Sequence, residues 1–273
     1  MTSEVRPLEG IKVVEFSHMV LGPSCGLILA DLGADVVKVE PAPGGDKTRQ
    51  LPGSGSGFFG AFNRNKRSVA VNLKSPEGHK FATNLVLESD VLIENFGTGV
   101  MDRLGLGYKA MQEINPQLIY CALKGFLSGP YENRAALDEV VQMMGGLAYM
   151  TGPKGRPLRA GASVNDLVGA LFGAVAIQAA LLERQRTDEG TFVRSGLFES
   201  NMFLVANHMV QYCQTGMPAD PMPERKASWA VYDVFQTADD EKVFVGVVSD
   251  KQWVEFCKAF SLKDLLKNRE LST

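Results

Sequence analysis

The sequence predicts an α/β protein: a large domain built on a mostly parallel sheet with helices on both faces, followed by part of a smaller α+β domain. Short apolar runs rich in β-branched residues alternate with helical patterns from residue 12 to about residue 214, and this alternation is typical of covered parallel sheets. A polar, proline-bearing stretch at residues 215–228 then interrupts the pattern. We therefore expect a large domain over residues 1–216, and a linker with the beginning of a small domain over residues 217–273.

The expected strands of the large domain are short and consist mainly of valine, isoleucine and leucine. They fall at residues 12–16, 35–40, 68–73, 90–94 and 118–123, with residues 191–197 as a further candidate. Strands buried on both faces have such continuous apolar runs. These runs predict the central sheet of the large domain.

Helical patterns separate these strands. The first begins near Gly22-Pro23, where proline suits the first turn of a helix. Others are expected at residues 76–88, 138–150, 166–186 and 199–214. The glycine-rich segment 44–60 is expected to be a flexible connection. After the linker, the runs VYDVF and KVFVGVV and the helical KQWVEFCKAF indicate the start of the small domain.

Composition excludes several classes of protein. The 273 residues carry a formal net charge of −3, with 45% hydrophobic and 22% charged residues, which is ordinary for a globular protein. A nucleic-acid-binding protein usually has a strong basic excess, so no nucleic-acid partner is expected. The N-terminus has no apolar signal core, and no uninterrupted run of about 18 apolar residues occurs. We therefore expect a cytoplasmic protein with no membrane segment.

The cysteines and histidines do not form a metal-binding pattern. Cys25, Cys121, Cys213 and Cys257 lie far apart, with no CxxC pair and no Cys/His cluster at zinc spacing. We expect buried thiols in a reducing compartment and no metal ion. The turn after the first strand is SHMVLGPSCG, which lacks the GxGxxG pattern of dinucleotide-binding proteins. NAD and FAD are therefore not expected.

Basic residues cluster in short loops beside the strands: Arg49, Arg64, Lys66, Arg67, Lys74 and Arg103. On the residues alone, solvated surface charges are the favoured interpretation. The alternative is a groove for a polyphosphate ligand, because α/β folds bind ligands in the loops at the strand ends. Phe96 follows the fourth strand, where it either stacks on an adenine or belongs to the core.

Asp166 stands at the start of an expected helix, after the segment GASVN. A structural role as a helix cap would account for an aspartate there without any chemistry. The alternative is a nucleophile that attacks a thioester. Gly169 and Gly173 favour this alternative, because a face without side chains would let a bulky partner approach.

Six segments in order resemble one family. They are EFSHMVLGP, ADLGADVVKVEPAPGGDKTR, FNRNKRSVAVNLKSPEG, VLIENFGTGVMDRLGLGY, INPQLIYCALKGF and GASVND. They are similar to the successive motifs of the class III CoA-transferases, the CaiB/BaiF family that includes formyl-CoA transferases. The resemblance extends from about residue 8 to residue 200, with a looser match to about residue 260.

The resemblance implies a fold, an activity and a site. It implies a Rossmann-like large domain, a small domain and a homodimer of two interlocked subunits. It implies transfer of coenzyme A from an acyl-CoA to a small carboxylic acid through an aspartyl anhydride and an aspartyl-CoA thioester, with Asp166 as the nucleophile and Asp138 as a second acidic residue. The family's coenzyme-binding positions fall on Lys74, Asn95, Phe96 and Arg103.

Some positions depart from the formyl-CoA transferase pattern. Ala135 and Leu137 stand where those enzymes have a lysine and a tyrosine, and Val20 replaces a glutamine. Residues 216–229 have no counterpart of the glycine-rich lid loop. These departures argue against formyl or oxalyl substrates. Family members are also longer, so the chain is expected to be C-terminally short.

Two other functions remain open. An acyl-CoA racemase or isomerase on the same scaffold would need a histidine-aspartate pair, and Leu137-Asp138 stands in its place. A non-catalytic coenzyme-A-binding fragment is the other alternative.

Overall fold

The structure is a computed structural model that describes residues 6–225 and 228–268. It divides into two compact units, Met1–Pro221 and Met222–Thr273, against an expected boundary after residue 216. Residues 1–5 lie outside the described residues. They belong to the N-terminal segment that lacks an apolar signal core.

The first unit is built on a six-stranded sheet in the order β3-β2-β1-β4-β5-β6. All five strand pairs are parallel. The strands are β1 (Lys12–Phe16), β2 (Asp35–Pro41), β3 (Arg67–Val71), β4 (Val91–Glu94), β5 (Ile119–Lys124) and β6 (Phe192–Gly196). The predicted parallel sheet is confirmed, and the candidate at residues 191–197 is its edge strand β6.

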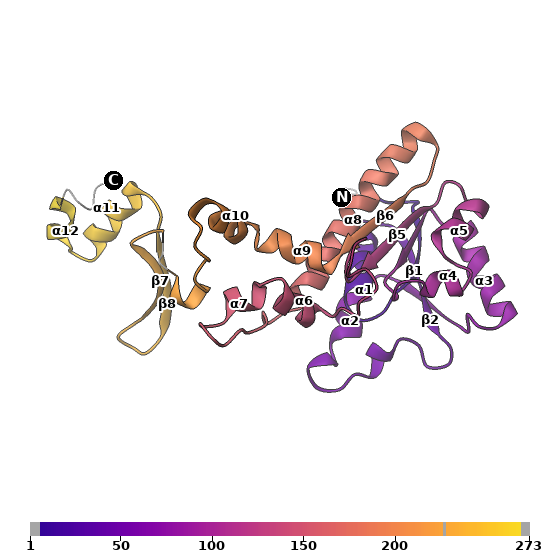
Figure 1. Cartoon of the computed structure of the whole chain (residues 1–273), viewed down its shortest axis with the longest axis horizontal. Helices are drawn as coiled ribbons and strands as arrows, with labels where there is room; N and C mark the ends of the chain where they lie inside the picture. Colours follow the sequence, from indigo (N-terminus) through magenta and orange to yellow (C-terminus); the bar gives the residue numbers. More distant parts are fainter. Residues whose placement is uncertain (1–5, 226–227, 269–273) are drawn as a thin grey trace, which may run out of the picture. The chain divides into compact units, whose positions relative to one another are not determined.

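Helices cover both faces of this sheet (Figure 1). They are α1 (Leu21–Asp31) and α8 (Val164–Thr187) on one face, and α3 (Pro76–Leu87), α4 (Val100–Arg103) and α5 (Tyr108–Ile114) on the other. Alternation along β1 explains the two layers. Val13 packs with the α1–α8 side, whereas Val14 and Phe16 pack with the α3–α5 side.

Helix α8 lies close against its neighbours because it lacks side chains at two positions. A Cβ atom at Gly169 would lie 2.9 Å from Leu21 Cδ1, and one at Gly173 would lie 2.7 Å from Leu123 Cδ2. The expectation that these glycines admit a bulky ligand is therefore wrong, since α1 and β5 occupy that space. Within the described residues, α8 is also the one helix long and apolar enough to cross a membrane. Its contacts with α1, β5 and β6 account for the apolar residues of its buried face, whereas Leu171, Val175 and Leu182 of the same helix are exposed.

Two expected helices are interrupted, and one expected flexible segment contains helical turns. The pattern at residues 138–150 forms α6 (Asp138–Met144) and α7 (Leu147–Thr151), separated where Gly146 adopts a φ of 84°. The pattern at residues 199–214 forms α9 (Leu197–Leu204) and α10 (Ala206–Thr215). Segment 44–60 contains the 3-10 turns η1 (Lys47–Gln50) and η2 (Gly53–Gly55) and the start of α2 (Phe58–Phe62).

The second unit contains the antiparallel pair β7 (Val231–Gln236) and β8 (Lys242–Val247), followed by α11 (Asp250–Ala259) and α12 (Lys263–Lys267). A 3-10 turn, η3 (Met222–Glu224), precedes them. Ser249 caps α11 by accepting the Gln252 N–H at 3.4 Å. The expected α+β character of this segment agrees with these elements.

The cysteines differ from the expectation at one position. Cys25, Cys121 and Cys257 are buried, but Cys213 is exposed on α10. The sequence pattern did not separate this cysteine from the others.

Candidate functional site

The candidate site lies at the carboxyl edge of the sheet, where the strand order reverses. From β1 the chain passes to β2 and β3, which lie on one side of β1 in the sheet. It then returns to β4 on the other side of β1 and continues outward to β5 and β6. Open α/β sheets bind ligands at the carboxyl ends of the strands beside such a reversal. The turn after β1 and the turn after β4 meet here.

A cavity of about 380 Å³ opens at this place. It brings together four of the predicted site residues: Asn95, Phe96, Asp138 and Asp166. Lys74 and Arg103 do not line it; Lys74 is exposed in the turn before α3, and Arg103 is exposed at the end of α4. Four basic residues that line it were not predicted as site residues from the sequence: His18, Lys124, Arg134 and Arg159.

The turn after β1 is tied to the turn after β4. The backbone N–H of His18 donates to Asn95 Oδ1 at 3.0 Å, and Asn95 Nδ2 donates to the His18 carbonyl at 2.9 Å. The ring of Phe96 stacks on that of His18, with centroids 5.8 Å apart and planes 18° apart. Burial lowers the pKa of His18, so its imidazole is neutral near pH 7.

A buried ionic network lies behind this turn. Lys38 Nζ donates to the Ser17 carbonyl at 2.7 Å and lies 3.2 Å from Glu15 Oε1, while Lys66 Nζ lies 2.8 Å from Glu15 Oε2. These side chains are at most 1% exposed. The network fixes the backbone that carries His18.

Most of the clustered basic residues are neutralised by carboxylates. Ion pairs join Lys66 to Glu15, Arg49 to Glu40, Arg64 to Asp31 and Arg67 to Asp35. These four positions therefore do not form the polyphosphate groove considered from the sequence. They hold β1, β2 and their connections together.

Asp166 is the third residue of α8, and its side chain is not a cap. The Asp138 carboxylate takes that role, because its Oδ1 accepts the Asn165 N–H at 2.7 Å and the Asp166 N–H at 3.2 Å. The Asp166 carboxylate has no hydrogen bond or ion pair within residues 6–225 and 228–268. The capping interpretation of Asp166 is therefore wrong.

The surroundings of Asp166 favour its neutral form. Burial is the main cause that raises the pKa of Asp166 to about 7, and the negative charges of Asp138 and Glu139 act in the same direction. Arg159 opposes them. The protonated and the ionised forms of this carboxyl group therefore both occur near neutral pH.

Asp138 is itself held by Gln142, one turn later on α6. Gln142 Nε2 donates to Asp138 Oδ2 at 2.5 Å, and Gln142 Oε1 accepts the Ala160 N–H at 2.7 Å. Gln142 is fully buried. The segment before α8 is thus connected to α6 through one amide side chain.

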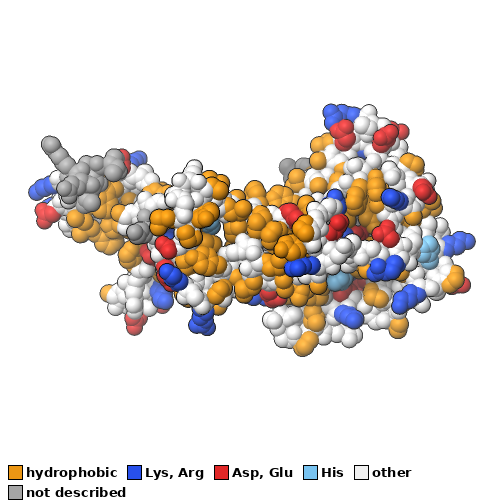
Figure 2. Space-filling view, in the orientation of Figure 1, with side chains coloured by type: hydrophobic (Ala, Val, Ile, Leu, Met, Phe, Trp, Pro, Cys, Tyr) orange, Lys and Arg blue, Asp and Glu red, His pale blue; other side chains and the backbone are white. Residues whose placement is uncertain are grey.

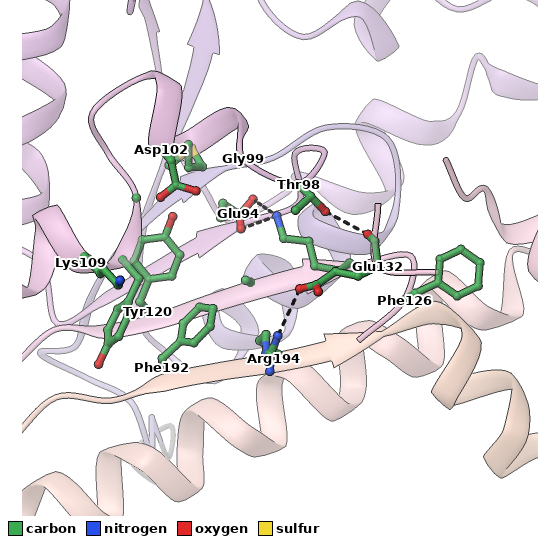
Figure 3. Close-up of a pocket in the computed structure, with 15 residues that line it drawn as sticks. Glu94, Thr98, Gly99, Asp102, Lys109, Tyr120, Phe126, Glu132, Phe192 and Arg194 are labelled. Carbon is green, nitrogen blue, oxygen red and sulfur yellow. Dashed lines mark hydrogen bonds and ion pairs between the residues drawn. The ribbon is translucent and has the colours of Figure 1, made fainter. Parts of the chain in front are cut away.

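A second cavity has a volume of about 460 Å³, and Figure 3 shows the side chains that line it. The two share Thr98, Lys124 and Glu132. Lys124 Nζ lies 2.5 Å from Glu94 Oε1, and Arg194 lies 3.7 Å from Glu132 Oε1. Lys124 thus stands on the wall between the cavities, with its charge balanced by Glu94.

Fold and cavity together define a class: a doubly wound α/β protein whose ligand cavity, at the reversal of strand order, contains an unpaired carboxylate at a helix start. The family model described as CoA-transferase family III matches residues 8–273. The chain belongs to this family.

Curated relatives agree with the assignment. The chain is 38% identical to an acyl-CoA transferase of Fusarium pseudograminearum, over 97% of this chain and 61% of that protein. It is 34% identical to the human succinyl-CoA:glutarate CoA-transferase, over 99% of this chain and 63% of that enzyme. The chain thus spans less than two thirds of the length of these relatives.

Solved structures show the same fold. A CaiB/BaiF family protein from Brucella suis superposes with a TM-score of 0.86 at 36% identity, covering 99% of this chain and 74% of that one. The α/β architecture with its parallel sheet is therefore that of the CaiB/BaiF proteins.

Proposed function

We propose that this protein is a CoA-transferase, which moves coenzyme A from an acyl-CoA donor to a carboxylic acid acceptor, with Asp166 as the nucleophile. The unpaired Asp166 carboxylate in the cavity carries the proposal. Family membership and the names of the relatives support it.

The chemistry conserves the energy of the thioester. An oxygen of ionised Asp166 attacks the donor carbonyl, the C–S bond breaks, and an anhydride and the coenzyme thiolate form. The thiolate attacks the aspartyl carbonyl, which releases the donor acid and leaves an aspartyl-CoA thioester. The acceptor carboxylate attacks this thioester and expels the thiolate. The thiolate then attacks the acceptor carbonyl of the new anhydride, which gives the new acyl-CoA and restores the Asp166 carboxylate.

The walls of the cavity support this sequence of steps. Leu197, Val20 and Leu21 are buried and line it beside Asp166, so part of the site excludes water, to which anhydrides and thioesters are sensitive. Asp138 keeps the start of α8 in place by accepting two of its N–H groups.

Coenzyme A is proposed to bind at the carboxyl edge of the sheet. Asn95 and Phe96 line the cavity, and Lys74 and Arg103 are exposed in segments that follow β3 and β4. Strands β3 and β4 are parallel members of one sheet, so their carboxyl ends share an edge. Phosphates of the coenzyme are proposed to bind to Lys74 and Arg103, with Phe96 near the adenine.

The acids are proposed to be small dicarboxylates. Two relatives bear the names succinyl-CoA:glutarate CoA-transferase, from human, and succinyl-CoA:mesaconate CoA-transferase, from Haloarcula marismortui. Their identities to this chain are 34% and 35%. Succinate, glutarate and mesaconate all carry two carboxylates.

We also propose an interlocked homodimer, in which residues 1–216 form the CoA-binding and catalytic domain and residues 217–273 begin the small domain. Large apolar side chains are exposed on α8, α9 and α10, among them Val175 at 61%, Phe203 at 67% and Val210 at 53%. Figure 2 shows hydrophobic side chains gathered over α9. An exposed apolar surface of this kind is typical of a protein–protein interface.

The test is to trap the acylated aspartate. The protein is incubated with succinyl-CoA and hydroxylamine, which converts an activated Asp166 carbonyl to a hydroxamate that peptide mass spectrometry identifies. Asp166→Asn is expected to lose this adduct and, because a carboxamide is a far poorer nucleophile, roughly three or more orders of magnitude of turnover. Asp220→Asn, at an exposed site in the same unit, is the matched control.

Other results would favour the alternatives. Exchange of the proton α to the thioester, without transfer, would indicate the racemase or isomerase. Binding of coenzyme A with neither reaction would indicate a non-catalytic binding protein. An Asp166→Asn variant with normal turnover would refute the aspartyl mechanism.

A further inference from the structure

The cations that line the Asp166 cavity differ in whether a carboxylate already neutralises them. Lys124 is paired with Glu94, and Arg159 is paired with Glu139. His18 lines the cavity with its ring against Phe96 and is neutral near pH 7, because burial lowers its pKa. These three groups therefore offer no free positive charge.

Arg134 is the exception among the described residues. Its guanidinium carbon lies 4.4 Å from the centroid of the Tyr131 ring, and no carboxylate is in contact with it. Arg134 lines the cavity with an exposed side chain, and arginine remains charged at any physiological pH, so the open side of the cavity carries a positive charge that no carboxylate of the described residues balances. An anion bound in the cavity would supply the missing partner.

The segment that carries Arg134 is anchored to the fold. Its backbone N–H donates to the Tyr131 carbonyl at 2.8 Å, and Thr98 Oγ1 donates to the Glu132 carbonyl at 3.1 Å. A Cβ atom on Gly125 would lie 2.2 Å from that of Ala136, so the segment packs directly on the end of β5. Arg134 therefore belongs to a defined wall of the cavity.

The position of Arg134 along the chain keeps it near the nucleophile. It precedes Asp138 by four residues, which limits the separation of their Cα atoms to about 14 Å. The carboxylate of Asp138 is in turn hydrogen-bonded to the Asp166 N–H at 3.2 Å. The residues between, Ala135, Ala136 and Leu137, carry no charge.

We propose that Arg134 binds the second carboxylate of a dicarboxylic substrate while the first carboxylate reacts at Asp166, and so determines a preference for dicarboxylic over monocarboxylic acids. The inference rests on the proposed CoA-transferase function. A second carboxylate must remain ionised during transfer, and its desolvation is costly unless a cation pairs with it. The planar guanidinium of arginine pairs with both oxygens of a carboxylate, which a lysine does not do equally well.

The test compares acids of similar length that differ in the second carboxylate. Transfer from succinyl-CoA to glutarate and to butyrate is measured as kcat/KM for the wild type, Arg134→Gln and Arg134→Lys. Loss of one charge-assisted interaction is expected to lower the glutarate value about 10- to 100-fold in Arg134→Gln. The butyrate value should change less than about threefold, and Arg134→Lys should lie between the wild type and Arg134→Gln for glutarate.

Because the donor succinyl-CoA also bears a second carboxylate, the comparison is repeated with acetyl-CoA as donor. The glutarate-to-butyrate ratio should depend on Arg134 in the same way with either donor. Arg156→Gln, at an exposed arginine outside the cavity lining, is the matched control and should leave both values unchanged. Equal loss for both acceptors, or no loss, in Arg134→Gln would overturn the inference.

Equilibrium binding separates this inference from the proposed function. Glutarate binding to the protein, measured by calorimetry, should weaken in Arg134→Gln by the same factor as kcat/KM, while butyrate binding should not change. If glutarate binding depends on Arg134 but no transfer of coenzyme A occurs, the proposed transferase function is refuted and the dicarboxylate site is supported. The opposite result is also possible to distinguish: the wild type transfers coenzyme A, but it binds glutarate no more tightly than Arg134→Gln does. That result would support the transferase function and refute the role of Arg134.

Discussion

The carboxylate of Asp138 accepts the backbone N–H of Asp166 at 3.2 Å, so one acidic side chain holds the start of the helix that carries the other. The same contact places a negative charge beside the Asp166 carboxyl group and helps to raise its pKa. Asp138 therefore has two effects on the nucleophile: it fixes the position of the backbone, and it favours the protonated side chain.

Activity should depend on the ionisation of Asp166. The pKa of its carboxyl group is raised to about 7, mainly by burial. Because only the ionised form attacks a thioester, kcat/KM should rise with pH through about 7 and level off above it. The 3′-phosphate of coenzyme A, like other phosphate monoesters, loses its second proton near about pH 6, so the profile is measured for the wild type and a variant with the same substrates and the part that differs is assigned to the protein. A flat profile from about pH 5 to 9 would contradict this assignment.

Asp138→Asn should move the acid limb of that profile to lower pH. The amide oxygen of asparagine still accepts the two N–H groups of α8, which keeps the start of the helix in place, while its amide nitrogen faces Gln142 Nε2 and that one hydrogen bond is lost. The negative charge is lost, and with it one cause of the raised pKa of Asp166. Asp188→Asn, at an exposed position after α8, is the control and should leave the limb in place.

Gln142→Leu should destabilise the first unit. It would leave the Ala160 N–H and one Asp138 oxygen without their partner, and each unsatisfied group costs about 1–3 kcal/mol. Urea unfolding is expected to show a loss of about 2–5 kcal/mol, whereas Gln211→Leu, on the exposed surface of α10, should change stability by less than about 0.5 kcal/mol. Equal stability of the two variants would show that the Gln142 bridge is not formed in solution.

Much of the fold was predictable because its strands are buried and apolar. The run KVVEF became β1 with the expected bounds, and VLIE became β4. The helix interruptions were not predictable in the same way. Gly146 adopts a positive φ between the end of α6 and the start of α7. The sequence does not show whether a glycine inside a helical pattern continues the helix or interrupts it in this way.

The site was predictable where motifs carried it. Asn95, Phe96 and Asp166 belong to segments that resemble a family, Asp138 corresponds to a second acidic position implied by that resemblance, and the cavity brings the four together. The role of Arg134 was not predictable, because a sequence does not show which cations have a carboxylate partner. Lys66, for example, is neutralised by Glu15, which lies 51 residues earlier in the sequence, and only the folded structure shows that pairing.

Lys38→Met should strongly destabilise the first unit and disturb the turn that carries His18. Lys38 is buried between Glu15 and Asp46, at 3.2 Å from each carboxylate. Removing one partner of a buried ion pair costs about 3–5 kcal/mol because an uncompensated charge remains. Arg67→Met removes an exposed pair with Asp35 and should cost less than about 1 kcal/mol by urea unfolding.

Replacing Asp166 by asparagine should stabilise the protein, and more so at high pH. The pKa of Asp166 is raised from 3.8 to about 7 in the folded state, so between these values the native protein binds a proton that the unfolded chain does not bind. Stability from this group is therefore present at low pH and lost as pH rises toward 7. Asparagine does not titrate and has no such loss.

Thermal unfolding of the wild type and Asp166→Asn at about pH 5 and about pH 8 measures the effect. The variant should have a higher Tm at the higher pH, and the difference should shrink at the lower pH, where Asp166 is largely protonated. Asp220→Asn, at an exposed carboxylate, should show no such pH dependence. A destabilised variant at the higher pH would mean that the Asp166 carboxylate has a stabilising partner, and the nucleophile would not be the unpaired group that the proposed chemistry requires.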